Sequence, residues 1–148
     1  MNFISLIYEF IILTTFFFSK GTVLDLSKDP IKKLAAGSMH SVALTHSGNV
    51  YVWGSNKEGQ LGLGDEAEET SYSAENLCFE KDTIKDISCG YYHTAIVTES
   101  GDLYTFGEAD GGKLGLGDIV NNNQDTIDEP TKVEIPEKVG RSKIISYA

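Results

Sequence analysis

From residue 31 onward, short alternating groups of apolar and polar residues are separated by turn sequences. Residues 41–45 alternate in size and polarity, as expected of a half-buried strand. The turn sequence 46–49 follows, with a glycine that can adopt a positive φ, and residues 50–53 return as the partner strand. The pattern predicts a β-hairpin, preceded by a short strand over residues 33–36.

The same pattern recurs 53 residues later without a gap. Residues 94–106 repeat the hairpin, and residues 86–89 repeat the short strand before it. Between residues 31–65 and 84–118, 15 of 35 aligned positions are identical. A fixed period of about 50 residues is typical of solenoids and propellers. We therefore expect two copies of one structural unit.

The N-terminal residues 1–30 follow a different pattern. Residues 3–18 are largely apolar and end in three phenylalanines. Three interpretations stay open, of which we favour the first: translated non-coding sequence foreign to the domain, a signal peptide or membrane anchor, or a strand of a neighbouring unit. Glu9 and the short apolar length argue against a membrane-spanning helix. A signal peptide would need a basic start and a small-residue cleavage site, and both are missing.

The segments after each copy differ from one another. Residues 66–83 are acidic and predict one further strand with a solvated loop. In residues 119–140, Val133 and Ile135 alternate with charged neighbours, as in a short outer strand. Residues 143–148 resemble the start of a third copy. Loops on a repeated scaffold often carry binding specificity.

Glycine-rich segments follow both hairpins, at residues 59–64 and 112–117. Their Gly-x-Leu-Gly-Leu-Gly pattern superficially resembles a phosphate-binding loop, but neither a following helix nor a Gly-Lys-Ser/Thr sequence is present. Acidic residues after Gly64 would repel phosphate. We interpret both segments as tight turns that direct leucines such as Leu61 and Leu63 inward.

Charge and cysteine content exclude several functions. The net charge is −10, with 22 acidic and 12 basic residues, which argues against a surface for direct nucleic-acid binding. Cys78 and Cys89 form no Cys-x-x-Cys pair and only three histidines exist, so no metal site is predicted. Unpaired thiols and the absence of an N-glycosylation sequon favour a reducing, intracellular setting.

His40 and His93 are the residues that most invite a catalytic interpretation. They occupy the same offset in both copies, so we expect each imidazole to support its own unit by hydrogen bonding to backbone. No Ser/His/Asp set, paired carboxylates or nucleotide loop occurs. The sequence predicts no catalytic residue, no cofactor and no enzyme in the ordinary sense.

The repeated motifs resemble the regulator of chromosome condensation (RCC1) repeat family. Each copy combines Gly-x-x-His-Ser/Thr, an aromatic-glycine pair and Gly-Gln/Lys-Leu-Gly-Leu-Gly. The signature positions, all interpreted as structural, are Gly37, His40, Gly48, Trp53, Gly54, Gly59, Leu61, Gly62, Gly64, Gly90, His93, Gly101, Phe106, Gly107, Gly112, Leu114, Gly115 and Gly117. The resemblance covers about residues 31–139.

This resemblance implies an all-β fold, a partial β-propeller with two full blades of an expected seven and four antiparallel strands per blade. The expected organisation is an apolar segment 1–30, a first repeat with its linker 31–83, a second repeat with a longer linker 84–142, and a truncated third repeat 143–148. Two such units cannot close a ring, so their strand edges stay open. We expect the chain alone to be marginally stable or insoluble.

Within the family, the second copy most resembles a GTPase regulator of the cilium. The resemblance implies a protein-binding platform in small-GTPase regulation, with a small GTPase, a GTPase-cycle adaptor or a scaffold protein as partner. The alternatives are guanine-nucleotide exchange on a Ran-type GTPase, and a membrane-anchored fragment if residues 3–18 are an anchor. The implied location is the cytoplasm, including cilium or centrosome, with the nucleus as alternative. No residue is assigned to a partner interface.

Overall fold

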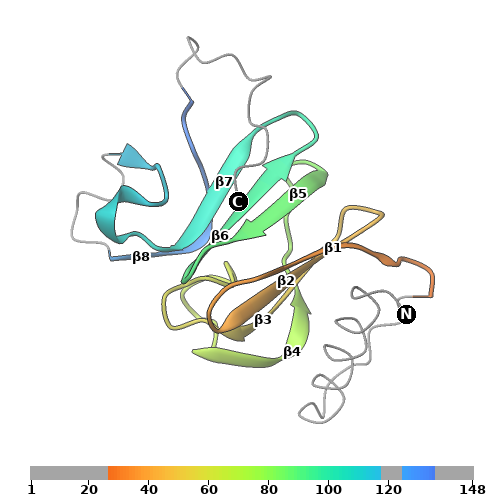
Figure 1. Cartoon of the computed structure of the whole chain (residues 1–148), viewed down its shortest axis with the longest axis horizontal. Helices are drawn as coiled ribbons and strands as arrows, with labels where there is room; N and C mark the ends of the chain where they lie inside the picture. The colour runs from red at the N-terminus through yellow and green to blue at the C-terminus, as the bar shows by residue number, and fades with distance from the viewer. Residues whose placement is uncertain (1–26, 118–124, 136–148) are drawn as a thin grey trace.

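The computed structural model describes residues 27–117 and 125–135, which form two four-stranded antiparallel sheets. We call them blade 1 and blade 2, one for each repeat (Figure 1). Blade 1 contains, in spatial order, β1 (Ile31–Ala36), β2 (His40–Thr45), β3 (Val50–Ser55) and β4 (Thr70–Asn76). Blade 2 contains β5 (Ile84–Cys89), β6 (His93–Thr98), β7 (Leu103–Glu108) and β8 (Thr126–Lys132). The predicted all-β fold with four antiparallel strands per blade is confirmed.

The outermost strand of blade 2 lies earlier in the chain than the sequence pattern indicates. Residues 133–135 follow β8 rather than forming an outer strand. The strand itself spans residues 126–132 and includes Pro130, within a stretch where its register with β7 shifts. Proline is tolerated there because an edge strand can lack an N–H donor. Pairing with β7 positions this strand, although its own residues show no alternating pattern.

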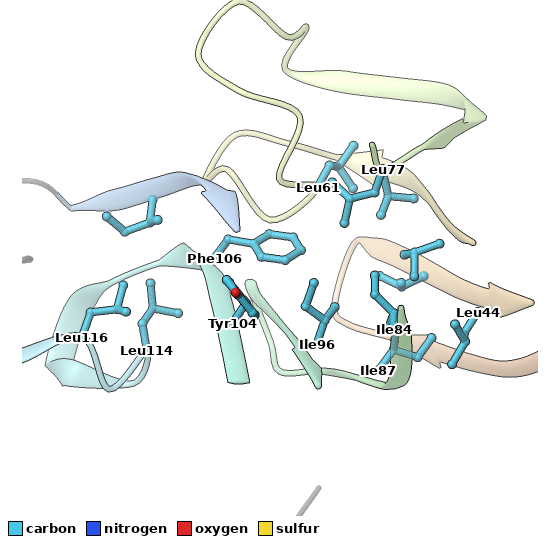
Figure 2. Close-up of a cluster of buried hydrophobic side chains, with 14 of the residues drawn as sticks. Leu44, Leu61, Leu77, Ile84, Ile87, Ile96, Tyr104, Phe106, Leu114 and Leu116 are labelled. Carbon is cyan, nitrogen blue, oxygen red and sulfur yellow. The ribbon is translucent and has the colours of Figure 1, made fainter. Parts of the chain in front are cut away.

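Apolar side chains from both blades meet in one continuous core (Figure 2). Phe106 of β7 is completely buried and packs against Gly62, where its ring would lie 2.7 Å from an added Cβ. Burial of one such aromatic side chain contributes about 3 kcal/mol. The remaining core residues that Figure 2 labels are Leu44, Leu61, Leu77, Ile84, Ile87, Ile96, Tyr104, Leu114 and Leu116. The blades therefore stabilise each other through residues that neither could bury alone.

Polar contacts join the first strands of the two blades. Lys33 Nζ of β1 lies 2.6 Å from Asp86 Oδ1 of β5, and Lys32 Nζ donates to the Lys85 carbonyl oxygen. Lys33 and Asp86 are the same position of the two repeats, 53 residues apart. The repeat thus places opposite charges on neighbouring blades at one shared site.

Several sequence predictions lie outside the described residues. These are the apolar segment 1–26, residues 119–124 and 136–142 of the longer linker, and the third-repeat start at 143–148. Within residues 27–117 and 125–135, no helix is long and apolar enough to cross a bilayer.

Candidate functional site

The Gly-x-x-His motif is a packing unit formed by a glycine and the imidazole three residues later. A Cβ added at Gly37 would lie 2.2 Å from His40 Cε1, and one at Gly90 would lie 2.0 Å from His93 Cε1. The ring therefore occupies the space that any larger residue would fill. This close approach explains why glycine and histidine recur together in both repeats.

The side chain of His40 forms a hydrogen bond to a side chain of the other blade. The expected bond to the backbone of its own repeat is therefore not the one observed. His40 Nε2 lies 2.9 Å from Thr94 Oγ1 of blade 2. The Thr94 hydroxyl donates to the Gln60 carbonyl oxygen at 2.7 Å, so its oxygen accepts from His40 Nε2–H. All three groups are buried. Because only tertiary packing brings these residues together, the repeat pattern could not predict this partner.

The environment of His40 keeps its imidazole neutral. Burial lowers the pKa of His40 to about 4, and the nearby His93 adds to the decrease. Burial also lowers the pKa of His93. Nδ1 of each ring is buried without a hydrogen-bond partner in the part of the chain that the structure describes. A protonated ring would place an uncompensated charge there, which is costly.

The aromatic-glycine pairs anchor the loops that precede β2 and β6. At Gly54 (φ 106°) an added Cβ would lie 2.4 Å from the Met39 carbonyl oxygen, and at Gly107 (φ 111°) 2.4 Å from that of Tyr92. The following residues donate backbone N–H groups to these same carbonyls, at 2.8 and 2.9 Å. Only glycine permits so close an approach of β3 and β7 to the loops of their own blades.

The glycine segments differ in their surroundings although their sequences match. In blade 1 the segment from Gly59 to Gly62 is buried, whereas Gly112 and Gly115 of blade 2 are exposed. The leucines Leu61 and Leu114 are buried in both, at 0% and 2% exposure. Blade 2 supplies the cover over blade 1. The remaining signature glycines lie at positive φ: Gly48 and Gly101 in the hairpin turns, Gly64 and Gly117 at the segment ends.

The loops before β2 and β6 form an exposed surface that the sequence did not assign. We define this loop surface as Ser38, Met39, Tyr91 and Tyr92. Met39 is 64% exposed and Tyr91 67% exposed. Ser38 N donates to the Tyr91 carbonyl oxygen at 3.0 Å, which joins the two loops. The rings of Tyr91 and Tyr92 meet edge to face with centroids 4.6 Å apart.

One signal in the sequence could have found this surface. The two positions between the glycine and the histidine differ between the repeats, being Ser-Met in one and Tyr-Tyr in the other. Large side chains at variable positions within a fixed motif do not serve the shared packing. Tyr and Met are enriched at protein interfaces, so such positions are candidates for binding.

Two aspartates that the sequence analysis did not identify accept hydrogen bonds from the hairpin turns. Asp29 Oδ1 accepts the Ser47 N–H at 3.0 Å, and Asp82 Oδ2 accepts the Ser100 N–H at 3.0 Å. Hydrogen bonds from these serines lower the pKa of Asp29 and of Asp82 to about 2. The two aspartates lie 53 residues apart. Extension of the repeat alignment by two residues would have revealed them.

The described residues hold no group of three or more metal-ligating side chains. Cys78 and Cys89 are free, and burial raises the pKa of the Cys89 thiol to about 11. A thiol with this pKa is a poor nucleophile at neutral pH. The loop surface, with its exposed side chains on loops held by backbone hydrogen bonds, is the candidate binding site among the described residues.

These features are those of a repeat protein of the β-propeller type. The regulator of chromosome condensation (RCC1) repeat matches residues 47–97 and 100–148, and a second form of the same repeat matches residues 31–60 and 84–112. The chain belongs to this family. The match extends to residue 148, beyond the residue 139 that the motifs had marked.

Among curated proteins, the chain is similar to the human X-linked retinitis pigmentosa GTPase regulator. The two are 44% identical over 122 residues, which is 82% of this chain and 11% of the relative. This relative is the GTPase regulator that the sequence motifs indicated, so that resemblance is confirmed. The ultraviolet-B receptor UVR8 of Arabidopsis thaliana is 48% identical over 88 residues, 60% of this chain and 20% of the relative.

Among solved structures, the chain is similar to Prp20p of Saccharomyces cerevisiae. The TM-score is 0.67 at 20% identity, over 78% of this chain and 28% of Prp20p. That likeness supports the fold alone. The chain spans a fifth or less of the length of the curated relatives described above.

Proposed function

We propose that this chain contributes two blades to an RCC1-type propeller that acts as a protein-binding platform in small-GTPase regulation. The observation that carries the proposal is the loop surface, where Met39 and Tyr91 are exposed on loops held by the backbone of both blades. The partner is a small GTPase or an adaptor or scaffold of its cycle. The name of the retinitis pigmentosa GTPase regulator supports this partner class.

The two loops are held rigidly, which favours binding of a partner without rearrangement of the chain. Each loop is hydrogen-bonded to the strand that contains Gly54 or Gly107, and the two loops are hydrogen-bonded to each other through Ser38 and Tyr91. Aromatic side chains on such a fixed base lose little conformational entropy when a partner covers them. A partner would therefore contact this surface with little rearrangement of the chain.

A second candidate function is guanine-nucleotide exchange on a Ran-type GTPase. The support is the fold of Prp20p, whose structure was described together with its binding properties toward Gsp1p and histones. This function would favour a nuclear location, whereas the platform favours the cytoplasm, including cilium or centrosome. The described residues supply no catalytic group, so exchange would depend on binding energy alone.

One experiment separates the two functions. The full chain would be immobilised and exposed to Ran-type and Arf-like GTPases loaded with a fluorescent guanine nucleotide. Binding without faster nucleotide release supports the platform, and accelerated release supports exchange. Tyr91→Ser is expected to weaken binding at least tenfold, because an interface aromatic is replaced by a small polar residue.

Tyr72→Ser is the matched control, since Tyr72 is 71% exposed but lies on β4 outside the loop surface. Binding by this control should equal that of the unchanged chain. Equal loss in both variants, or no binding to any GTPase of either type, would overturn the proposal.

A further inference from the structure

We propose that the loop surface binds a basic segment of its protein partner, one in which apolar side chains stand beside arginine or lysine. This rests on the proposed platform function, because it names the chemistry of the partner that the same surface would take. The centre of the loop surface is apolar and exposed, and the residues behind it are acidic. The apolar centre gives the place of binding, and the carboxylates give the charge of the partner.

The centre of the loop surface carries no charge of its own. The two loops, residues 37–39 and 90–92, contain no carboxylate, amine or guanidinium. Met39 and Tyr91 are both exposed, although the backbone beneath them is held by the hydrogen bond from Ser38 to Tyr91. The centre of a protein interface is depleted in charged residues and enriched in tyrosine and methionine. A partner would therefore place apolar groups over these side chains.

In blade 1, backbone hydrogen bonds place a carboxylate behind this centre. Ser55 N donates to the Met39 carbonyl oxygen at 2.8 Å, and Asn56 N donates to the Glu69 carbonyl oxygen at 2.7 Å. Glu69 is therefore separated from Met39 by two strand spacings, or about 10 Å. Its side chain is exposed. A partner that covers Met39 would thus also reach the carboxylate of Glu69.

Blade 2 repeats this arrangement with the equivalent residues. Glu108 N donates to the Tyr92 carbonyl oxygen at 2.9 Å, and Ala109 N donates to the Asp125 carbonyl oxygen at 2.9 Å. Asp125 is exposed and occupies the place that Glu69 has in blade 1. Both loops therefore have an exposed carboxylate behind them, at the same position of the two sheets.

A further carboxylate makes the blade 2 side more acidic. Asp110 begins the 3-10 helix η1 (Asp110–Gly112) and is exposed. We call Glu69, Asp110 and Asp125 the acidic rim. Two lysines lie at the same end of the sheets: Lys57, which stands on blade 1 at the position of Asp110, and Lys113, which is already in an ion pair. Negative charge is thus in excess beside the tyrosines, and it favours a positively charged partner.

Arginine and lysine suit both features of the surface at once. Their long aliphatic stems can pack on Met39 and Tyr91 while the charged heads reach the carboxylates of the acidic rim. An acidic segment would be repelled. Because the rim is exposed, its charges select the partner and speed association more than they add affinity. Binding should therefore weaken as the salt concentration rises.

Three peptides of equal length test the charge of the partner. Each carries the same leucines on a glycine–serine backbone, with arginine, citrulline or glutamate beside each leucine. The isotope-labelled full chain would be titrated with each peptide while its amide signals are followed by NMR. We expect the arginine peptide to shift the signals of Met39 and Tyr91, with an affinity about tenfold above that of the neutral citrulline peptide. Equal affinities for these two peptides, preference for the glutamate peptide, or shifts confined to residues outside the loop surface would overturn the proposal.

Removal of charge from the acidic rim should weaken binding of the arginine peptide. Asp110→Asn combined with Asp125→Asn removes two charges, and the affinity should fall by about fivefold. The matched control, Glu80→Gln with Glu99→Gln, also removes two exposed carboxylates, but from the connections at the other end of the sheets. Its affinity should stay within about twofold of that of the unchanged chain. Equal losses in the two variants would show that only net charge matters, and would overturn the proposal. If a variant fails to fold, the comparison of arginine with citrulline decides, because it changes only the peptide.

The same variants separate the basic partner from the platform function. A GTPase that binds and is weakened by Tyr91→Ser, but is unaffected by the loss of Asp110 and Asp125, would overturn the basic partner and leave the platform in place. A preference for the arginine peptide, without binding of any GTPase, would overturn the platform and support the basic segment. Absence of binding in both experiments would overturn both.

Discussion

The glycine segments of the two blades have nearly the same sequence but opposite surroundings. Residues 59–62 are buried beneath blade 2, whereas Gly112 and Gly115 are exposed. The difference shows that several signature residues serve the contact with the next repeat rather than the fold of their own. His40 makes the same point, because its hydrogen-bond partner belongs to blade 2. A repeat of this type is therefore complete only with its neighbour.

Alanine substitution at two equivalent glycines, one in each blade, should give the largest difference in stability between the blades. Gly59 and Gly112 share a φ of 72°, so alanine costs about 1 kcal/mol at either position. At Gly59 the new Cβ also meets Asp128 Cα at 2.8 Å, and overpacking adds about 2 kcal/mol. Urea unfolding should show a loss of about 3 kcal/mol for Gly59→Ala and about 1 for Gly112→Ala. Equal losses would mean that blade 2 does not constrain the segment.

Removal of the hydroxyl at the blade boundary should have the next largest effect. Thr94→Val keeps the shape of the side chain but leaves His40 Nε2 and the Gln60 carbonyl oxygen without a partner. Two buried unsatisfied groups predict a loss of about 2 to 3 kcal/mol in the free energy of unfolding. Ser41→Ala, at the equivalent half-buried position, should change stability by under about 0.5 kcal/mol. Similar losses at both sites would contradict a role specific to the boundary.

Acid should weaken the boundary through His40. Its pKa falls from 6.5 to about 4 on folding, so the unfolded chain binds the proton first as the pH decreases. The stabilisation is complete above pH 6.5 and is lost as the pH falls toward 4, by about 2 kcal/mol. Urea midpoints measured between pH 7.5 and 4.5 should show this decrease, and His40→Gln should flatten it. An NMR titration of His40 with a midpoint near 6.5 would contradict the buried, neutral imidazole.

Reversal of the charges between β1 and β5 should have the smallest effect. Lys33 and Asp86 are both 41% exposed, so their ion pair contributes about 0.5 kcal/mol. Lys33→Asp should therefore cost under about 1 kcal/mol, and the double exchange Lys33→Asp with Asp86→Lys should restore most of it. A thermal-melting double-mutant cycle measures the coupling. A loss that the double exchange does not restore would show that the pairing is not electrostatic.

Local pattern predicted most of the fold. The hairpins lie where alternation and turn glycines placed them, because their strands are adjacent in sequence and carry β-forming residues. Strand β8 was misplaced by several residues. Its sequence, TIDEPTK, lacks alternation and contains a proline, so only pairing with β7 across a long linker defines it. Non-local pairing of this kind leaves no periodic signal.

The candidate site was less predictable than the fold. Comparison of the repeats identified His40 as a scaffold residue, but the contact with Thr94 depends on how two sheets pack. The exposure of Met39 and Tyr91 likewise follows from the glycines on either side of their loops, which draw the backbone inward and leave these side chains outside. The sequence therefore identified the glycines but not the exposed side chains of Met39 and Tyr91 between them and the histidines.

The proline in the outer strand of blade 2 has a consequence for aggregation. The strand registers place Pro130 of β8 at the same position as Ala74 of β4. A further strand that extends a sheet pairs with the backbone N–H groups along the sheet edge. Pro130 has no backbone N–H group, and its ring occupies that position instead. Both outer strands have a shift in register against their partner strand, but only that of blade 2 also carries a proline at the rim. Amyloid-like growth, if provoked, should begin along β4.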